Sequence, residues 1–296
     1  MSVDLVTPLY KTCAALYRTL PRAVSEGITE TVYAAVAELS ADRRLLVTRH
    51  LRRAQRGLTG APLDRAIRAT FKSYGRYWVE SFRLPKLTEA ELDFGISWEG
   101  LEHVYAPMLA GRGAIVVMPH LGGWEWAAFW AARILGFEVT AVVEPVEPPE
   151  LFDFFTDFRE SLGIHVVPLG RGAGQAVLRA LREGQMLALL SDRDIEGTGV
   201  EVEFFGERTT LPAGPATLAL RSGAPLVPAA VYFRGGRHHA VVRPPVPVER
   251  TGARLRDDVQ RITQLLATEL ELLIRAAPEQ WHLFQPNWPS DPGYGD

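Results

Sequence analysis

Cysteine, net charge and long apolar runs are all scarce in this sequence, and each scarcity excludes a class of protein. The single Cys13 among 296 residues rules out an intrachain disulfide or a cysteine metal cluster and favours an intracellular protein. The longest apolar stretches, such as Ala114–Met118 and Met186–Leu190, fall far short of the roughly 18 residues that cross a bilayer. A formal net charge of −3 argues against a generally basic nucleic-acid-binding protein.

The first residues also lack the basic region, the continuous apolar core and the small-residue cleavage site of a signal peptide. We therefore expect a protein that stays on the cytoplasmic side of the membrane. With 47% apolar and 23% charged side chains, the composition is that of a folded globular protein. About three quarters of the unfolded chain's surface can be buried at this length, so a single domain over residues 1–296 needs no metal to hold its core.

Residues 1–95 show helical periodicity. Leu9, Cys13, Leu16 and Leu20 recur at helical spacing before Pro21 ends the run, which predicts an amphipathic helix. Such a helix either packs on its own domain or lies on a membrane surface. We expect this N-terminal portion to dock on a membrane.

A second helix is predicted over residues 41–57, and one of its faces is basic. Arg49, Arg52 or Arg53, and Arg56 share that face by helical spacing. The face suits anionic lipid headgroups or nucleic acid, although a merely solvated helix face is an equal alternative. No base-reading residues accompany it, so we expect an anionic membrane surface, and no nucleic acid, as its partner.

From about residue 111 the pattern changes to short β-rich runs that alternate with helices. This alternation predicts an α/β core over residues 96–285, with a mostly parallel central sheet flanked by helices. The Gly/Pro-rich tail, residues 286–296, is expected to be loose. The predicted strands are Ala114–Met118, Glu138–Val143, His165–Pro168, Met186–Ser191, Glu201–Phe205, Leu226–Phe233 and Ala240–Val242, and the predicted helices cover 124–135, 149–162, 173–183, 213–222 and 254–276.

The segment Pro119–Glu125 follows an apolar strand and precedes an aromatic helix. His120 is therefore expected at the carboxyl end of a strand, where open α/β sheets bind their ligands. On a regular helix Glu125 would point about 140° away from it, so the Gly122-Gly123 turn is needed to bring the two together. A histidine beside a carboxylate can act as a general base, because the carboxylate fixes the tautomer and stabilises the imidazolium.

Two other patterns are weaker evidence for a functional site. Gly170-Arg-Gly172-Ala-Gly174 follows a strand as a dinucleotide-binding loop would, but its third glycine comes one residue early, so no nicotinamide or flavin is expected. The adjacent His238-His239 lack the spacing of metal ligands, and no metal site is expected. The sequence contains no Gly-x-Ser-x-Gly elbow, P-loop or His-Glu-x-x-His motif.

Besides the His120-x4-Glu125 spacing, several segments resemble those of one known family in their order along the chain and in their residue types. They are Phe158–Gly163, Ser191–Asp194, Gly199–Gly206, Ala213–Pro228 and Pro278–His282. Together they resemble the bacterial lipid A late acyltransferases, and within that group most closely the actinobacterial phosphatidylinositol mannoside acyltransferases. The resemblance spans nearly the whole chain, and it is far more specific than the histidine and glutamate alone.

The resemblance implies a fold like that of glycerolipid acyltransferases and a reaction in which acyl-CoA acylates a mannose hydroxyl of a phosphatidylinositol mannoside. His120 would deprotonate that hydroxyl for attack on the thioester. Glu201 matches the glutamate that mannoside acyltransferases use with the histidine, so it is the favoured partner of His120. Glu125 is expected in a supporting position farther from the histidine. Glu203 lies on the same side of the strand as Glu201 by alternation, so the choice between these two stays open.

The resemblance also implies a set of substrate-binding residues. Arg159 and Arg193 fall in family-like segments and could hold the inositol phosphate or the phosphates of coenzyme A, unless each forms an ordinary ion pair. Trp124 is expected to wall an acyl-chain site, although an aromatic residue on a helix is often plain core. Glu144 and Glu203 complete the expected set. No cofactor is expected beyond acyl-CoA as the donor substrate.

Direct transfer without a covalent enzyme intermediate is expected, because Cys13 lies in the N-terminal helix and no serine adjoins His120. Alternatives within the same class are acylation of lipid A or of a lysophospholipid. A non-catalytic lipid-binding protein of the membrane surface is the alternative from another class, and it would not depend on His120. The expected location is the cytoplasmic face of the plasma membrane, with peripheral attachment.

Overall fold

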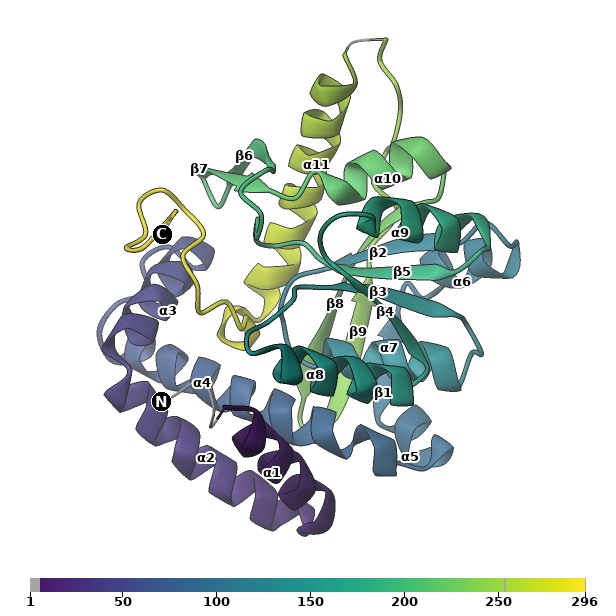
Figure 1. Cartoon of the computed structure of the whole chain (residues 1–296). Helices are drawn as coiled ribbons and strands as arrows, with labels where there is room; N and C mark the ends of the chain where they lie inside the picture. The colour runs from purple at the N-terminus through teal and green to yellow at the C-terminus, as the bar shows by residue number, and fades with distance from the viewer. Residues whose placement is uncertain (1–5, 253, 296) are drawn as a thin grey trace.

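The computed structural model describes residues 6–252 and 254–295, and in this part of the chain a seven-stranded sheet lies between two layers of helices (Figure 1). Its strands are β1 (Ile96–Glu99), β2 (Ala114–Met118), β3 (Val139–Val143), β4 (Ile164–Pro168), β5 (Met186–Leu190), β8 (Leu226–Arg234) and β9 (Arg237–Val242). The strand order is β1-β9-β8-β2-β5-β3-β4, and only the β8–β9 pair is antiparallel among the described strands of this sheet. The predicted α/β class with a mostly parallel sheet is confirmed.

A small antiparallel hairpin stands apart from the main sheet. It consists of β6 (Val200–Phe204) and β7 (Glu207–Leu211). The strand predicted over Glu201–Phe205 therefore exists, one residue earlier, but it does not belong to the central sheet.

The helices surround the sheet and extend from it at one side. They are α1 (Val6–Thr19), α2 (Arg22–Leu39), α3 (Ala41–Ala54), α4 (Gly60–Arg83), α5 (Glu89–Phe94), α6 (Glu102–Leu109), α7 (Trp124–Arg133), α8 (Pro149–Ser161), α9 (Ala173–Arg182), α10 (Gly214–Ser222) and α11 (Leu255–Ala276), with short 3-10 turns at η2 (Leu84–Lys86) and η3 (Pro278–Gln280).

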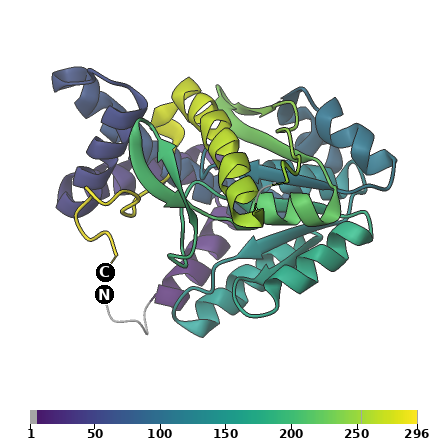
Figure 2. The same cartoon turned by 90° about the horizontal axis from the view of Figure 1, so that it is seen from above.

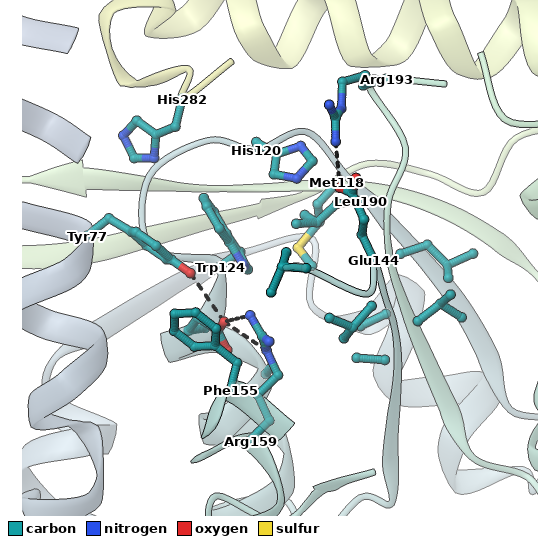
Figure 3. A pocket seen from close by; sticks show the side chains of 18 of the residues that line it. Tyr77, Met118, His120, Trp124, Glu144, Phe155, Arg159, Leu190, Arg193 and His282 are labelled. Atoms are coloured by element: carbon teal, nitrogen blue, oxygen red, sulfur yellow. Dashed lines mark hydrogen bonds and ion pairs between the residues drawn. The ribbon is translucent and has the colours of Figure 1, made fainter. Parts of the chain in front are cut away.

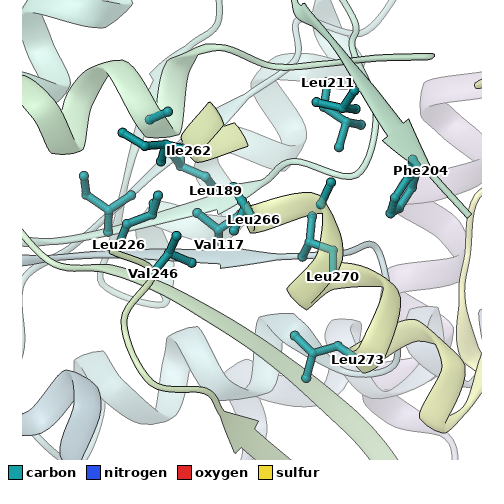
Figure 4. Packing of buried hydrophobic residues seen from close by; sticks show 14 of the residues in the cluster. Val117, Leu189, Phe204, Leu211, Leu226, Val246, Ile262, Leu266, Leu270 and Leu273 are labelled. Atoms are coloured by element: carbon teal, nitrogen blue, oxygen red, sulfur yellow. The ribbon is translucent and has the colours of Figure 1, made fainter. Parts of the chain in front are cut away.

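Strand β2 is buried on both faces, which explains its unbroken apolar sequence. Val117 points into a cluster with Leu266 and Leu270 of α11, as Figure 4 shows. Val116 points to the opposite face, into a cluster that includes Trp126 of α7. Each such buried aliphatic side chain contributes roughly 1.5–3 kcal/mol. The carboxyl end of β2 is thus held rigidly from two sides.

The helices α1 to α4 form the N-terminal portion and lie beside the α/β core in both views (Figures 1 and 2). Helix α1 packs inward through Tyr10, whose ring lies 5.3 Å from Trp78 and 5.4 Å from Phe155. Leu9 and Leu16 of the predicted apolar stripe are instead 48% exposed. Across residues 6–252 and 254–295, the helices are too short or too polar to span a membrane.

The C-terminal tail is bound to α3 and is not the loose segment that the sequence predicted. The side chain of Asp291 is fully buried and accepts hydrogen bonds from Arg49 (2.9 Å) and Arg53 (2.8 Å) of α3. Part of the predicted basic face of α3 therefore pairs with this chain's own carboxylate. The buried ion pairs explain how a Gly/Pro-rich segment, poor in helix and strand formers, is fixed in place.

Candidate active site

The site lies at the carboxyl ends of two neighbouring parallel strands. In the register of β2 and β5, Met118 is opposite Leu190. His120 comes two residues after the end of β2, and Asp192 comes two residues after the end of β5. The parallel pairing therefore brings together two polar side chains that are 72 residues apart in the chain.

His120 and Asp192 form a hydrogen-bonded pair. The Nδ1 atom of His120 lies 2.6 Å from Oδ1 of Asp192, and the backbone N–H of His120 donates to Oδ2 at 3.1 Å. The indole N–H of Trp281 donates to the same Oδ2 at 2.7 Å. The Asp192 side chain is fully buried, whereas that of His120 is 27% exposed. The carboxylate thus holds the ring from behind while the ring faces the cavity.

Asp192 is ionised in this environment. Burial opposes the charged form, but the positive charge that His120 can carry and the hydrogen bonds from His120 and Trp281 outweigh it, so the pKa of Asp192 lies below its ordinary value. An ionised Asp192 accepts the Nδ1–H of His120 and leaves Nε2 as the basic nitrogen.

The loop after His120 is held by backbone contacts that require glycine. Gly122 has a φ of +60°, and a Cβ there would collide with the carbonyl oxygen of Val231. The N–H groups of Gly122 and Gly123 donate to the carbonyl oxygens of Gln280 (3.0 Å) and Val231 (3.1 Å). The predicted turn exists, but its effect is to fix the loop rather than to bring Glu125 to His120.

Glu201 does not partner His120, and the predicted pairing is corrected to His120–Asp192. The Glu201 side chain is 59% exposed and lies 3.5 Å from Arg208 on β7. The reason is the alternation of strand β6, whose Val200 and Val202 are buried, so that Glu201 and Glu203 point to solvent. Neither glutamate lines the cavity beside His120 in the described part of the chain.

Glu125 lines the cavity but is paired elsewhere. It is 4% exposed, and its Oε1 accepts hydrogen bonds from Arg159 (2.6 and 3.1 Å) and from the hydroxyl of Tyr77 (3.2 Å). Burial and the charge of Glu125 raise the pKa of Tyr77 well above 10, which keeps its hydroxyl a donor. Arg159, predicted to hold a phosphate unless it formed an ion pair, forms an ion pair with Glu125.

The other predicted residues lie around the same cavity. Arg193 forms an ion pair with Glu144 at 2.6 Å, and the Glu144 side chain is 39% exposed. Trp124 stacks on Tyr77 with 4.1 Å between ring centroids and makes an edge contact with His120 at 5.7 Å. The structure thus gathers His120, Trp124, Glu144 and Arg193 at one place, as Figure 3 shows.

The cavity has a volume of about 270 Å³ and adjoins a smaller apolar pocket of about 40 Å³. The two share the side chains of Met118, Ala128 and Ala188. The second pocket lies between the sheet and α7, and only apolar and aromatic residues line it, Trp98 and Trp130 among them. The arrangement offers polar groups at the cavity and a purely apolar space behind it.

Four residues of the site were not predicted as site residues, although three of them, Asp192, Trp281 and His282, lie in segments that carry the resemblance; the fourth is Tyr77. Asp192 follows an apolar strand as closely as His120 does, and this was the signal that could have identified it. The other residues come from α4 and from the segment after η3, and no local pattern connects them to the end of β2.

Among residues 6–252 and 254–295, no group of three or more histidine, cysteine, aspartate or glutamate side chains could hold a metal ion. His238 is buried and pairs with Glu80 at 2.9 Å, and His239 contacts Ser97 at 2.9 Å. The two adjacent histidines therefore have separate structural partners.

Comparisons with known proteins agree over most of the chain. Residues 4–290 match the family described as bacterial lipid A biosynthesis acyltransferase. The chain is 36% identical over 279 residues to a phosphatidylinositol mannoside acyltransferase of Mycolicibacterium smegmatis, covering 92% of this chain and 89% of that protein. Phosphatidylinositol mannoside acyltransferases of two Mycobacterium tuberculosis strains, CDC 1551 / Oshkosh and H37Rv, are 40% identical over 230 residues, or 75% of this chain and 70% of theirs.

Proposed function

Because this chain belongs to the bacterial lipid A biosynthesis acyltransferase family, we propose that it transfers a long fatty acyl chain from acyl-CoA to a mannose hydroxyl of a phosphatidylinositol mannoside. It is an acyltransferase, and relatives that are 36–40% identical to it over 230 to 279 aligned residues carry that acceptor in their names. The proposal adds the donor, the reacting group and the residues that act.

The hydrogen-bonded pair of His120 and Asp192 on the cavity wall is the observation that carries this proposal. Nε2 of His120 takes the proton of the mannose hydroxyl as its oxygen attacks the thioester carbonyl carbon. A C–O bond forms and the carbonyl oxygen becomes an oxyanion. When the C–S bond breaks, its electron pair stays on sulfur, and the imidazolium of His120 returns the proton to the departing thiolate. Asp192 stabilises that imidazolium and keeps the ring oriented.

The surrounding residues suit the two substrates. The apolar pocket beside Met118 has a volume of about 40 Å³, so it takes only a short part of the acyl chain, and the rest of the chain lies in the larger cavity at His120. Glu144 is partly exposed and can accept hydrogen bonds from sugar hydroxyls, while Arg193, which is ion-paired with it at 2.6 Å, holds its carboxylate in place. Glu125 and Arg159 neutralise each other and shape the cavity wall.

Peripheral attachment to the cytoplasmic face of the membrane completes the proposal. Val24, Ile28 and Val32 of α2 are 46%, 48% and 49% exposed and share one helix face by their spacing of four residues. Leu9 and Leu16 of α1 are exposed to the same degree. Apolar helix faces of this kind insert into the headgroup region of a bilayer.

The experiment that tests the proposal is acyl transfer from palmitoyl-CoA to phosphatidylinositol mannosides, a lipid A precursor and lysophospholipids, with the wild type and His120→Ala. We expect labelled mannoside from the wild type and no product from the variant, with palmitoyl-CoA binding retained. Labelling of a lysophospholipid or lipid A alone would overturn the acceptor. A wild type that leaves the thioester intact with every acceptor would overturn the reaction and favour a lipid-binding protein.

A further inference from the structure

A second histidine lies on the cavity wall beside His120. His282 follows η3, and its backbone N–H donates to the carbonyl oxygen of His120 at 2.6 Å. Its ring lies 5.9 Å from that of Trp124, which also contacts His120 at 5.7 Å. Figure 3 shows the two histidine rings next to each other with Trp124 below them. His282 is 5% exposed and lines the cavity.

The two ring nitrogens of His282 have different surroundings. Nε2 lies 2.8 Å from the hydroxyl oxygen of Ser73 on α4. Nδ1 is buried and, among the described residues, has no hydrogen-bond partner. A buried donor that stays unsatisfied costs about 1–3 kcal/mol, so a substrate oxygen that accepts from Nδ1 would recover this cost.

The 2.8 Å contact with Ser73 is compatible with a ring that carries its proton on Nδ1, because the serine hydroxyl then donates to Nε2. We assign this tautomer to His282. Burial and the positive charge that His120 can carry lower the pKa of His282 to about 3, so the ring stays neutral at physiological pH.

We propose that His282 donates its Nδ1–H to the carbonyl oxygen of the thioester and stabilises the oxyanion that forms there. This inference rests on the proposed acyl transfer and adds a catalytic residue to it. The proton stays on Nδ1 throughout, while His120 alone accepts and returns the proton of the attacking hydroxyl. Donors aimed at a developing oxyanion in a site closed to water are worth about 10²- to 10³-fold in kcat.

The two histidines act in opposite senses because of what stands behind each ring. A carboxylate accepts the Nδ1–H of His120 and makes its Nε2 basic. A hydroxyl donates to Nε2 of His282 and leaves the opposite edge of a neutral ring as a donor. Neutrality matters, since a second imidazolium beside His120 would oppose the protonation of His120 that the reaction needs.

The test uses two amide variants that differ in where they put an N–H. The amide nitrogen of asparagine reaches about as far as Nδ1 of histidine, and that of glutamine reaches about as far as Nε2. We expect His282→Gln to lower kcat about 10²- to 10³-fold and His282→Asn to stay within roughly 10-fold of the wild type. Ser73→Ala, which frees Nε2 and releases the tautomer, should lower kcat about 10-fold.

Hydrolysis of palmitoyl-CoA by water, measured without acceptor, separates this role from acceptor binding. An oxyanion donor serves both reactions, so His282→Gln should slow transfer and hydrolysis by the same factor, with unchanged affinity for a thioether analogue that lacks the carbonyl. Loss of transfer alone, or equal activity of His282→Asn and His282→Gln, would overturn the proposal. Thermal unfolding of both variants provides the folding control.

The same assay distinguishes failure of the acceptor assignment from failure of this inference. A wild type that hydrolyses palmitoyl-CoA but labels no mannoside would overturn the proposed acceptor while the hydrolysis rates still decide the role of His282. A wild type that turns over palmitoyl-CoA in neither reaction would overturn both proposals.

Discussion

Two regions of the molecule present carboxylates next to strands, and they differ in almost every physical respect. Asp192 follows β5 of the main sheet, is fully buried and is bound by His120 and Trp281. Glu201 lies within β6 of the hairpin, is 59% exposed and faces Arg208 across the strand pair. The position of Asp192 follows from the end of a strand, whereas the position of Glu201 follows from the face of the strand on which it lies.

The difference teaches where a parallel sheet places functional side chains. Residues within a strand alternate between its faces, so the burial of Val200 and Val202 against the core obliges Glu201 to face water. Residues just after a strand escape this alternation and meet the ends of the neighbouring strands. A surface ion pair such as Glu201–Arg208 contributes little, about 0–1 kcal/mol.

The largest effect that the comparison predicts is on catalysis at Asp192. Asp192→Asn keeps the shape of the side chain but removes the charge that fixes the tautomer of His120 and stabilises its imidazolium. We expect kcat for acyl transfer to fall about 10³- to 10⁴-fold, as when an amide replaces the carboxylate behind a catalytic histidine. Steady-state kinetics with palmitoyl-CoA measure the loss. A decrease of less than 10-fold in a folded variant would contradict the pairing.

A second prediction concerns Asp291, which is buried like Asp192 but belongs to the tail. Its carboxylate accepts hydrogen bonds from Arg49 and Arg53 and from the backbone N–H groups of Asn287 and Trp288. Asp291→Ala removes the acceptor of the two buried backbone N–H groups, whereas Arg49 is 35% exposed and Arg53 keeps its ion pair with Glu207, so the free energy of unfolding should fall by about 1–3 kcal/mol. Urea unfolding followed by tryptophan fluorescence measures it.

The tail also reaches the site, which adds a kinetic readout to this variant. The side-chain amide of Asn287 donates to the carbonyl oxygen of Asp192 at 2.9 Å. Loosening the tail should therefore lower kcat modestly, far less than Asp192→Asn does. An unchanged unfolding free energy would show that burial of this carboxylate does not hold the tail.

The third prediction is a pH dependence of stability that originates at His282. Its pKa is about 3 in the folded protein against an ordinary value of 6.5, so between these values the unfolded chain binds the extra proton. The free energy of unfolding then rises with pH, and this group adds at most about 1.4 kcal/mol per pH unit. His282→Asn cannot titrate, so its unfolding free energy between pH 4 and pH 6 should depend less steeply on pH.

Parallel urea titrations of the wild type and His282→Asn at pH 4, 5, 6 and 7 measure the two slopes. The values at pH 7 serve as the reference for each protein, because the ring of His282 in the wild type and the amide in the variant are both uncharged there. Equal slopes would mean that His282 is already accessible to protons in the folded state, which contradicts its burial.

The sequence was informative wherever a local pattern determines structure. Alternating apolar runs and helical periods predicted the parallel sheet and the helices around it, because each element is defined by its own spacing. The strands β1 and β7 were missed. β1 has only four residues, and β7 (Glu207–Leu211) has a polar sequence that a strand in a hairpin tolerates.

Of the His120–Asp192 pair, only the histidine was predictable from the sequence. His120 stands out because a strand, two glycines and an aromatic helix surround it. Asp192 lies in the family-like segment Ser191–Asp194 but was not predicted as a partner of His120, since strand order alone makes β2 and β5 neighbours and nothing in one sequence specifies that order. The resemblance favoured Glu201 as the partner of His120. The burial pattern of β6 excludes this pairing, because it turns Glu201 toward solvent.

The smallest expected effect is the one that tests the comparison most directly. Glu201→Gln is the same chemical change as Asp192→Asn, carboxylate to amide, made at the exposed position. Since Glu201 contacts Arg208 across the hairpin and not the cavity, kcat and KM should stay within about 2-fold and the unfolding free energy within about 0.5 kcal/mol. The same kinetic and urea assays apply. A loss that rivals that of Asp192→Asn would mean that the hairpin closes over the cavity when substrate binds, and the buried carboxylate would then share its role with the exposed one.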